Sequence, residues 1–143
     1  MKTGDTIFFY PDDSLQSFLI TKLSGSKFTH AGIILKTKSE FLVLESTFGT
    51  NRKIVNLNSY KNRKYEIVTT SDYFDYSIFN ELDFIHYGYL DLVMFGIQYV
   101  LSWFNIKFKP KNYSGEICTE FVQLCLNMNC KLLTPEQLYQ KLL

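Results

Sequence analysis

The sequence predicts an α+β domain in which helices pack against an antiparallel β-sheet. Three observations lead to this class. Short β-forming segments follow one another in the first half, polar turns separate them, and helical spacing of apolar residues dominates the second half. The chain has 143 residues, a length typical of one domain with a sizeable core. We therefore assign residues 1–143 to a single domain.

The first half of the chain contains the predicted strands. Segment 6–10, TIFFY, is rich in β-forming residues and follows a Gly-Asp turn. The other predicted strands are apolar runs bounded by polar residues: 30–35 (HAGIIL), 41–46 (FLVLES), 53–57 (KIVNL) and 65–70 (YEIVTT). Residues 36–40, KTKSE, have the composition of a hairpin connection. Consecutive short strands of this kind favour antiparallel pairing.

One helix is expected within the strand-rich half and several after it. Segment 12–23 has apolar residues at helical spacing, with Asp12 or Asp13 as its cap and Gly25 as its stop. The later predicted helices are 75–88, 89–104, 117–128 and 134–143, the last with a threonine cap and a proline at its first position. Residues 105–116 are predicted to form a loop.

Charge and hydropathy exclude two classes of partner. The 15 basic and 14 acidic residues give a net charge of +1, and no basic cluster stands out, so we expect no nucleic-acid ligand. The longest apolar stretch, 89–104, is shorter than the roughly 20 residues that span a bilayer, so we expect no transmembrane segment. The N-terminus has no signal-peptide pattern. We expect a cytoplasmic protein, or for a virus-encoded chain a host-intracellular or virion-associated one.

The three cysteines, Cys118, Cys125 and Cys130, all lie in one short segment. An odd number without distant partners argues against a disulfide framework. Their spacing with the histidines also lacks the close ligand pairs of a zinc site, so we expect neither a metal nor another cofactor. Cys125 and Cys130 fit the common role of cysteine as a small buried hydrophobe.

Cys118 is the candidate nucleophile, because it lies at the start of a predicted helix. The positive end of the helix dipole favours a thiolate there. Free backbone N–H groups of the first turn can also stabilise an oxyanion. The alternative is that Cys118, like most free cysteines, is only a buried small hydrophobe.

His30 and Glu45 are the candidate partners of this cysteine. His30 begins an apolar strand, so its imidazole can act as the base that activates a thiol. Glu45 ends the neighbouring strand, where a hairpin with its turn near residues 37–39 brings it level with Gly32 to His30. The carboxylate can then orient the imidazole. The alternatives are a hydrogen-bonded core histidine and a solvated strand-end carboxylate. His86 we assign a structural or substrate-lining role.

The ordered motifs resemble the circularly permuted papain-like cysteine hydrolases. The stretches that carry the resemblance are TGDTIFFYPDD, SGSKFTHAGIIL, LES, GEICTEFVQLCL and LLTPEQLYQKLL. The branch they are most similar to is the YiiX-like group of the NlpC superfamily, which is related to the lecithin–retinol acyltransferase-like enzymes. In that group the histidine precedes the cysteine, and the cysteine opens a helix within Cys-Ser/Thr-Glu. Here the order is His30, Glu45, Cys118, with Thr119 in place of the common serine.

The resemblance implies a permuted papain-like fold with the catalytic cysteine at a helix N-terminus. It also implies that Cys118 is the nucleophile, His30 the base and Glu45 the orienting acid of a cysteine peptidase or amidase. The expected substrate is a small peptide or lipid-linked amide, cleaved through a thioester. We expect the Cys118 sulfur within about 4 Å of a His30 ring nitrogen. The alternative is a structural or binding protein, of viral origin for example, that keeps the fold without turnover.

Overall fold

A computed structural model of the chain gives the fold. It describes residues 1–47, 50–70, 73–75, 77, 97, 100–101, 104–106, 117–129 and 131–143. The strands are β1 (Thr6–Phe9), β2 (His30–Lys36), β3 (Phe41–Thr47), β4 (Thr50–Asn56) and β5 (Tyr65–Val68). The helices are α1 (Leu15–Ser24), the 3₁₀ helix η1 (Leu57–Tyr60), α3 (Cys118–Cys125) and α4 (Pro135–Leu142). The predicted helices 75–88 and 89–104 and the predicted loop 105–116 lie largely outside the described residues.

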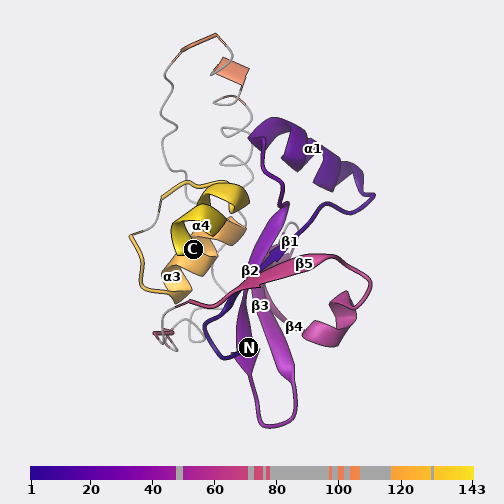
Figure 1. Cartoon of the computed structure of the whole chain (residues 1–143), viewed down its shortest axis with the longest axis vertical. Helices are drawn as coiled ribbons and strands as arrows, with labels where there is room; N and C mark the ends of the chain where they lie inside the picture. The colour runs from indigo at the N-terminus through magenta and orange to yellow at the C-terminus, as the bar shows by residue number, and fades with distance from the viewer. Residues whose placement is uncertain are drawn as a thin grey trace.

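The strands of the described region form one antiparallel sheet in the order β4-β3-β2-β1-β5. In Figure 1 the long β2 and β3 strands lie side by side and end in the β2–β3 hairpin. The α+β class and the antiparallel sheet are therefore confirmed. β2 lies in the middle of the order, and its first residue, His30, is paired with Phe9 of β1.

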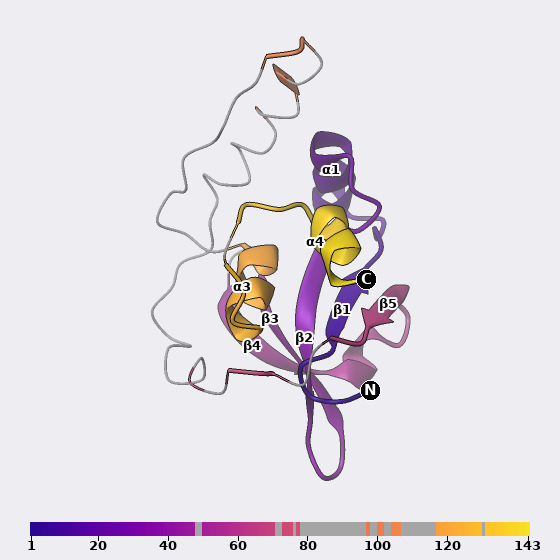
Figure 2. The ribbon, with the colours of Figure 1, turned by 60° about the vertical axis from the view of Figure 1, so that its left-hand side comes forward.

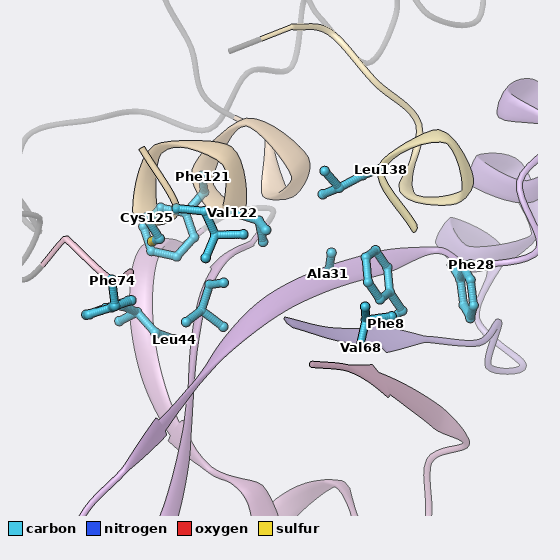
Figure 3. Close-up of a cluster of buried hydrophobic side chains, with 12 residues drawn as sticks. Phe8, Phe28, Ala31, Leu44, Val68, Phe74, Phe121, Val122, Cys125 and Leu138 are labelled. Atoms are coloured by element: carbon cyan, nitrogen blue, oxygen red, sulfur yellow. The ribbon is translucent and has the colours of Figure 1, made fainter. Parts of the chain in front are cut away.

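The two faces of the sheet carry different layers. The face with Phe8, Ala31 and Ile33 joins a core cluster with side chains of α3 and α4, drawn in Figure 3. Figure 2 shows α3 and α4 together on that side of the sheet. On the opposite face Ile34 belongs to a second cluster, which includes Leu57 of η1. Successive side chains of β2 therefore pack into two apolar layers in turn. This explains why the sequence of β2 is almost continuously apolar.

Three helix ends were predicted from capping residues, and the structure confirms two of them. Gly25 ends α1 with φ 64°, the left-handed conformation that glycine adopts without strain. Thr134 caps α4 and accepts a hydrogen bond from the Gln137 N–H. The predicted cap of α1, Asp12 or Asp13, is wrong: Ser14 is the cap and accepts from the Ser17 N–H. The Asp12 carboxylate instead accepts from the Ser14 and Ser17 hydroxyls, both at 2.5 Å.

Candidate active site

The first residues of β2 are shaped by a close approach to β3. A Cβ atom at Gly32 would lie 2.9 Å from Val43 Cγ1 and 3.0 Å from the Leu44 carbonyl oxygen. It would also lie 3.4 Å from the Glu45 Cβ. Only glycine therefore fits beside β3 at this position. The missing side chain leaves the space next to His30, on the same side of β2, open to Glu45.

His30 and Glu45 meet across this space. His30 Nε2 and Glu45 Oε2 are 2.7 Å apart, which is the short distance typical of a charge-assisted hydrogen bond. The two side chains are 13% and 2% exposed. The Phe9 ring stacks against the imidazole with centroids 5.7 Å apart. The histidine ring is thus fixed on one side by a carboxylate and on one face by an aromatic ring.

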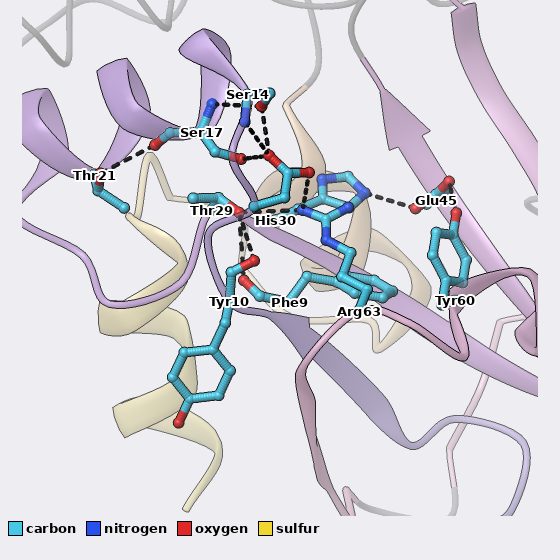
Figure 4. Close-up of polar contacts among 11 residues, drawn as sticks. Phe9, Tyr10, Ser14, Ser17, Thr21, Thr29, His30, Glu45, Tyr60 and Arg63 are labelled. Carbon is cyan, nitrogen blue, oxygen red and sulfur yellow. Dashed lines mark hydrogen bonds and ion pairs between the residues drawn. The ribbon is translucent and has the colours of Figure 1, made fainter.

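The Glu45 carboxylate has two further partners on its other oxygen, which Figure 4 shows in part. The Tyr60 hydroxyl donates to Oε1 at 2.5 Å, and Lys53 Nζ lies 3.2 Å from the same atom. Burial alone would raise the pKa of Glu45, but its bonds with His30, Tyr60 and Lys53 lower that pKa to about 2. Glu45 is therefore ionised throughout the neutral range.

Cys118 is the first residue of α3, and the residues around it explain the Cys-Thr-Glu motif. The Glu120 carboxylate accepts from the Ile117 N–H at 3.2 Å, just before the helix begins. The Thr119 hydroxyl donates to the Leu133 carbonyl at 2.8 Å, so it ties the helix start to the segment that leads into α4. A helix leaves its first N–H groups without partners within the helix, and Cys118 begins the turn that carries these groups.

A second tie holds the start of α3 from inside the core. Gln123 is fully buried, and its amide nitrogen donates to the Thr119 carbonyl at 3.1 Å and the Lys131 carbonyl at 2.8 Å. Its amide oxygen accepts from the Lys131 N–H at 3.2 Å. These bonds connect the middle of α3 with the chain before α4. The first turn of α3 is therefore fixed relative to the rest of the fold.

Cys118 is the third member of the group. It is 6% exposed, and it lies close enough to His30 to act on the charge of the ring. Burial opposes a charged ring, but Cys118 and Glu45 outweigh it and raise the pKa of His30 to about 9. An imidazolium is therefore favoured at neutral pH.

A polar cluster borders the histidine on the side of α1 (Figure 4). Arg63 Nη2 donates to the Thr29 hydroxyl at 3.3 Å and lies 3.6 Å from the Asp12 carboxylate. The Arg63 guanidinium also lies over the Phe9 ring, 4.8 Å from its centroid. Thr29, the residue before His30, donates its N–H to the Phe9 carbonyl at 2.9 Å. This cluster anchors the start of β2 to β1 and to the cap of α1.

The structure joins His30 to Glu45 by a hydrogen bond, and Cys118 acts on the charge of His30. The catalytic roles of the three residues stay predictions. Cys125 is a reduced, fully buried residue of the apolar cluster under α3. Cys130 and His86 lie outside the described residues. The sequence reasoning did not identify Tyr60 or Lys53 as site residues. Pairing of the two predicted strands could have indicated Lys53, which lies directly opposite Glu45 in the β3–β4 register. No feature of the sequence indicated Tyr60.

Among the described residues, no three or more His, Cys, Asp and Glu side chains are grouped in a way that could hold a metal ion. In the same residues, no helix combines the length and the apolar character needed to cross a membrane.

Comparison with known proteins gives a match at the level of structure. No protein-family model and no curated protein matches the chain. Among solved structures, the chain is similar to the metalloprotein YiiX from Escherichia coli O157:H7. The TM-score is 0.50 at 20% sequence identity, and the match covers 89% of this chain and 67% of YiiX. The chain therefore has a YiiX-like α+β fold, the fold that its motifs resemble.

Proposed function

We propose that the protein is a cysteine hydrolase that cleaves an amide bond through a thioester on Cys118. The observation that carries this proposal is the position of the His30 ring. Its Nε2 lies 2.7 Å from the Glu45 carboxylate, and the Cys118 side chain lies close enough to help raise its pKa. A nucleophile beside a base that an acid orients is the arrangement of a catalytic triad, and this likeness supports the proposal.

In the proposed first step, the Cys118 thiolate attacks the carbonyl carbon of the substrate. The N–H groups of the first turn of α3 donate to the oxyanion that forms. The His30 imidazolium gives its proton to the departing nitrogen, so the amine leaves neutral and a thioester remains on Cys118. Glu45 keeps its charge throughout and holds the ring by Nε2.

In the proposed second step, neutral His30 takes a proton from water, and the hydroxide formed attacks the thioester carbonyl. Collapse of the second oxyanion releases the acid, and the sulfur leaves as a thiolate. His30 is then again an imidazolium, so the starting pair is restored. An acceptor alcohol or amine in place of water would make the same site an acyltransferase.

The substrate we propose is a small peptide or a lipid-linked amide. YiiX itself is called a metalloprotein, but the described residues of this chain offer no matching group of metal ligands. His30 and Glu45 are bound to each other, and each already has a role in the covalent mechanism.

Acyl-enzyme trapping tests the proposal. The protein is mixed with activated acyl esters and with peptide and lipid amides, quenched in acid, and analysed by intact and peptide mass spectrometry. We expect one acyl group on Cys118, released by hydroxylamine as a thioester should be. Cys118→Ala should give no adduct, and Cys125→Ala should behave as wild type. Absence of an adduct in folded wild-type protein would favour the alternative, a binding or structural protein with this fold.

A further inference from the structure

The two oxygens of the Glu45 carboxylate face different partners. Oε2 lies 2.7 Å from His30 Nε2. Oε1 accepts from the Tyr60 hydroxyl at 2.5 Å and lies 3.2 Å from Lys53 Nζ. A carboxylate that is bound at one oxygen only can rotate about its last bond. With both oxygens bound, its plane is fixed, and so is the direction of the bond to the histidine.

We propose that Tyr60 is a positioning residue of the site, whose hydroxyl holds Glu45 in the rotamer that keeps Oε2 on His30. This inference deepens the proposed function and rests on it. Tyr60 acts through Glu45 and has no contact with the reacting atoms in the mechanism. It would add a fourth member to the group, supplied by the 3₁₀ helix η1.

The surroundings of Tyr60 support this role. Tyr60 is the last residue of η1, whose first residue, Leu57, is buried in the second apolar cluster. The Asn56 side chain caps η1 by accepting from the Asn58 N–H at 2.8 Å. The Tyr60 ring packs on Phe9 with centroids 4.7 Å apart. The hydroxyl is therefore presented to Glu45 from a fixed backbone and a packed ring.

Two features separate Tyr60 from Lys53, the other partner of the same oxygen. The Lys53 side chain is 41% exposed, so solvent screens its charge and its long side chain is free to move. Burial, together with the bond to Glu45, raises the pKa of Tyr60 above its ordinary value. The hydroxyl therefore stays protonated and continues to donate well above neutral pH.

The test observes the His30–Glu45 bond directly. The chain has 2 histidines, so the ring N–H signals are few, and a His86→Gln variant assigns them. We measure by NMR at pH 7 how fast the His30 Nε2–H exchanges with water. In Tyr60→Phe, which keeps the ring, the exchange should become about tenfold faster, as expected for the loss of one ordinary hydrogen bond. Alkylation of Cys118 at pH 7 should slow by a similar factor.

Tyr65→Phe is the matched control. The Tyr65 ring also packs near Phe9, with centroids 6.1 Å apart, and the contacts of Glu45 in the described structure do not include it. Unchanged exchange in Tyr60→Phe, or an equal increase in Tyr65→Phe, would overturn the proposal. The exchange measurement needs no turnover, so it tests the role of Tyr60 independently of catalysis. The proposed function would instead fail if wild-type Cys118 formed no acyl adduct.

Discussion

The first and last turns of α3 carry the same residue type in opposite surroundings. Cys118 is 6% exposed and Cys125 is fully buried, so burial alone does not separate them. Their neighbours do: Cys118 helps to raise the pKa of His30, which is bound to Glu45, whereas Cys125 belongs to the apolar cluster of Phe121 and Leu44. A buried cysteine is therefore a candidate nucleophile because of the groups that can take its proton and stabilise its charge.

Exchanging each cysteine for alanine tests this contrast with the largest expected effect. Cys118→Ala should abolish acyl-enzyme formation and leave the fold intact. Cys125→Ala should keep activity and lower the free energy of unfolding by about 1 kcal/mol, because it removes one buried group from the core. Cys130→Ser should also keep activity. Activity assays with urea unfolding measure both effects, and loss of activity in folded Cys125→Ala or Cys130→Ser would show that the nucleophile is misassigned.

The stability of the protein should depend on pH through two groups, His30 and Glu45. The pKa of His30 is raised from 6.5 to about 9, so its contribution is complete below pH 6.5 and is lost as pH rises through 9. The pKa of Glu45 is lowered from 4.5 to about 2, so its contribution is complete above pH 4.5 and is lost as pH falls through 2. The His30 contribution is at most about 3 kcal/mol.

Urea unfolding at pH 6 and pH 9.5 measures that loss, with His30→Gln as the control that lacks the titrating ring. The difference in stability between the two proteins should shrink as pH rises from 6 to 9.5. A difference that stays constant over this range would contradict the charged pair.

Gly32→Ala tests the space that brings His30 and Glu45 together. The added Cβ would lie 3.0 Å from the Leu44 carbonyl oxygen, a backbone atom that cannot move away without shifting β3. We expect a loss of about 2 kcal/mol in the free energy of unfolding, as is typical of overpacking. Ala31→Gly is the control. It exchanges the same two residue types at the neighbouring position, and so shows the effect of backbone flexibility. A Gly32→Ala protein as stable as wild type would show that the close approach is not required.

Glu45→Gln should give the smallest change in chemistry. The amide keeps the size of the side chain and can still accept from His30, but it stabilises an imidazolium less. We expect Cys118 alkylation near pH 7 to slow about tenfold, with residual turnover, since an orienting group has been weakened rather than the nucleophile removed. Alkylation profiles that coincide with those of wild type would mean that Glu45 is only a strand-end carboxylate.

Local signals in the sequence predicted most of the described fold. Ile33 and Ile34 in an apolar run predicted β2, Gly25 predicted the end of α1, and Thr134 before a proline predicted the start of α4. The prediction of the α1 cap was wrong because three consecutive polar residues, Asp12 to Ser14, all suit that position. Only the path of the chain decides which of them meets the free N–H groups.

The candidate site could be predicted only in part, for a related reason. Gly32 and the hairpin turn fix the β2–β3 register, so the meeting of His30 with Glu45 follows from local sequence. Tyr60 could not be predicted, because its contact depends on where η1 packs against the sheet. Cys118 lies 88 residues after His30 in sequence, and no spacing rule connects positions so far apart. The ordered motifs supplied that pairing.

Alkylation of the two described cysteines of α3 across pH 5 to 9 tests the central claim most directly. Iodoacetamide labelling is quantified separately on the peptides that contain Cys118 and Cys125, in folded wild-type protein. We predict that Cys118 labels rapidly, because the imidazole of His30 can take its proton, while Cys125, which lies in an apolar cluster, stays unlabelled. Labelling of Cys118 that is no faster than that of Cys125 at any pH in this range would contradict the claim.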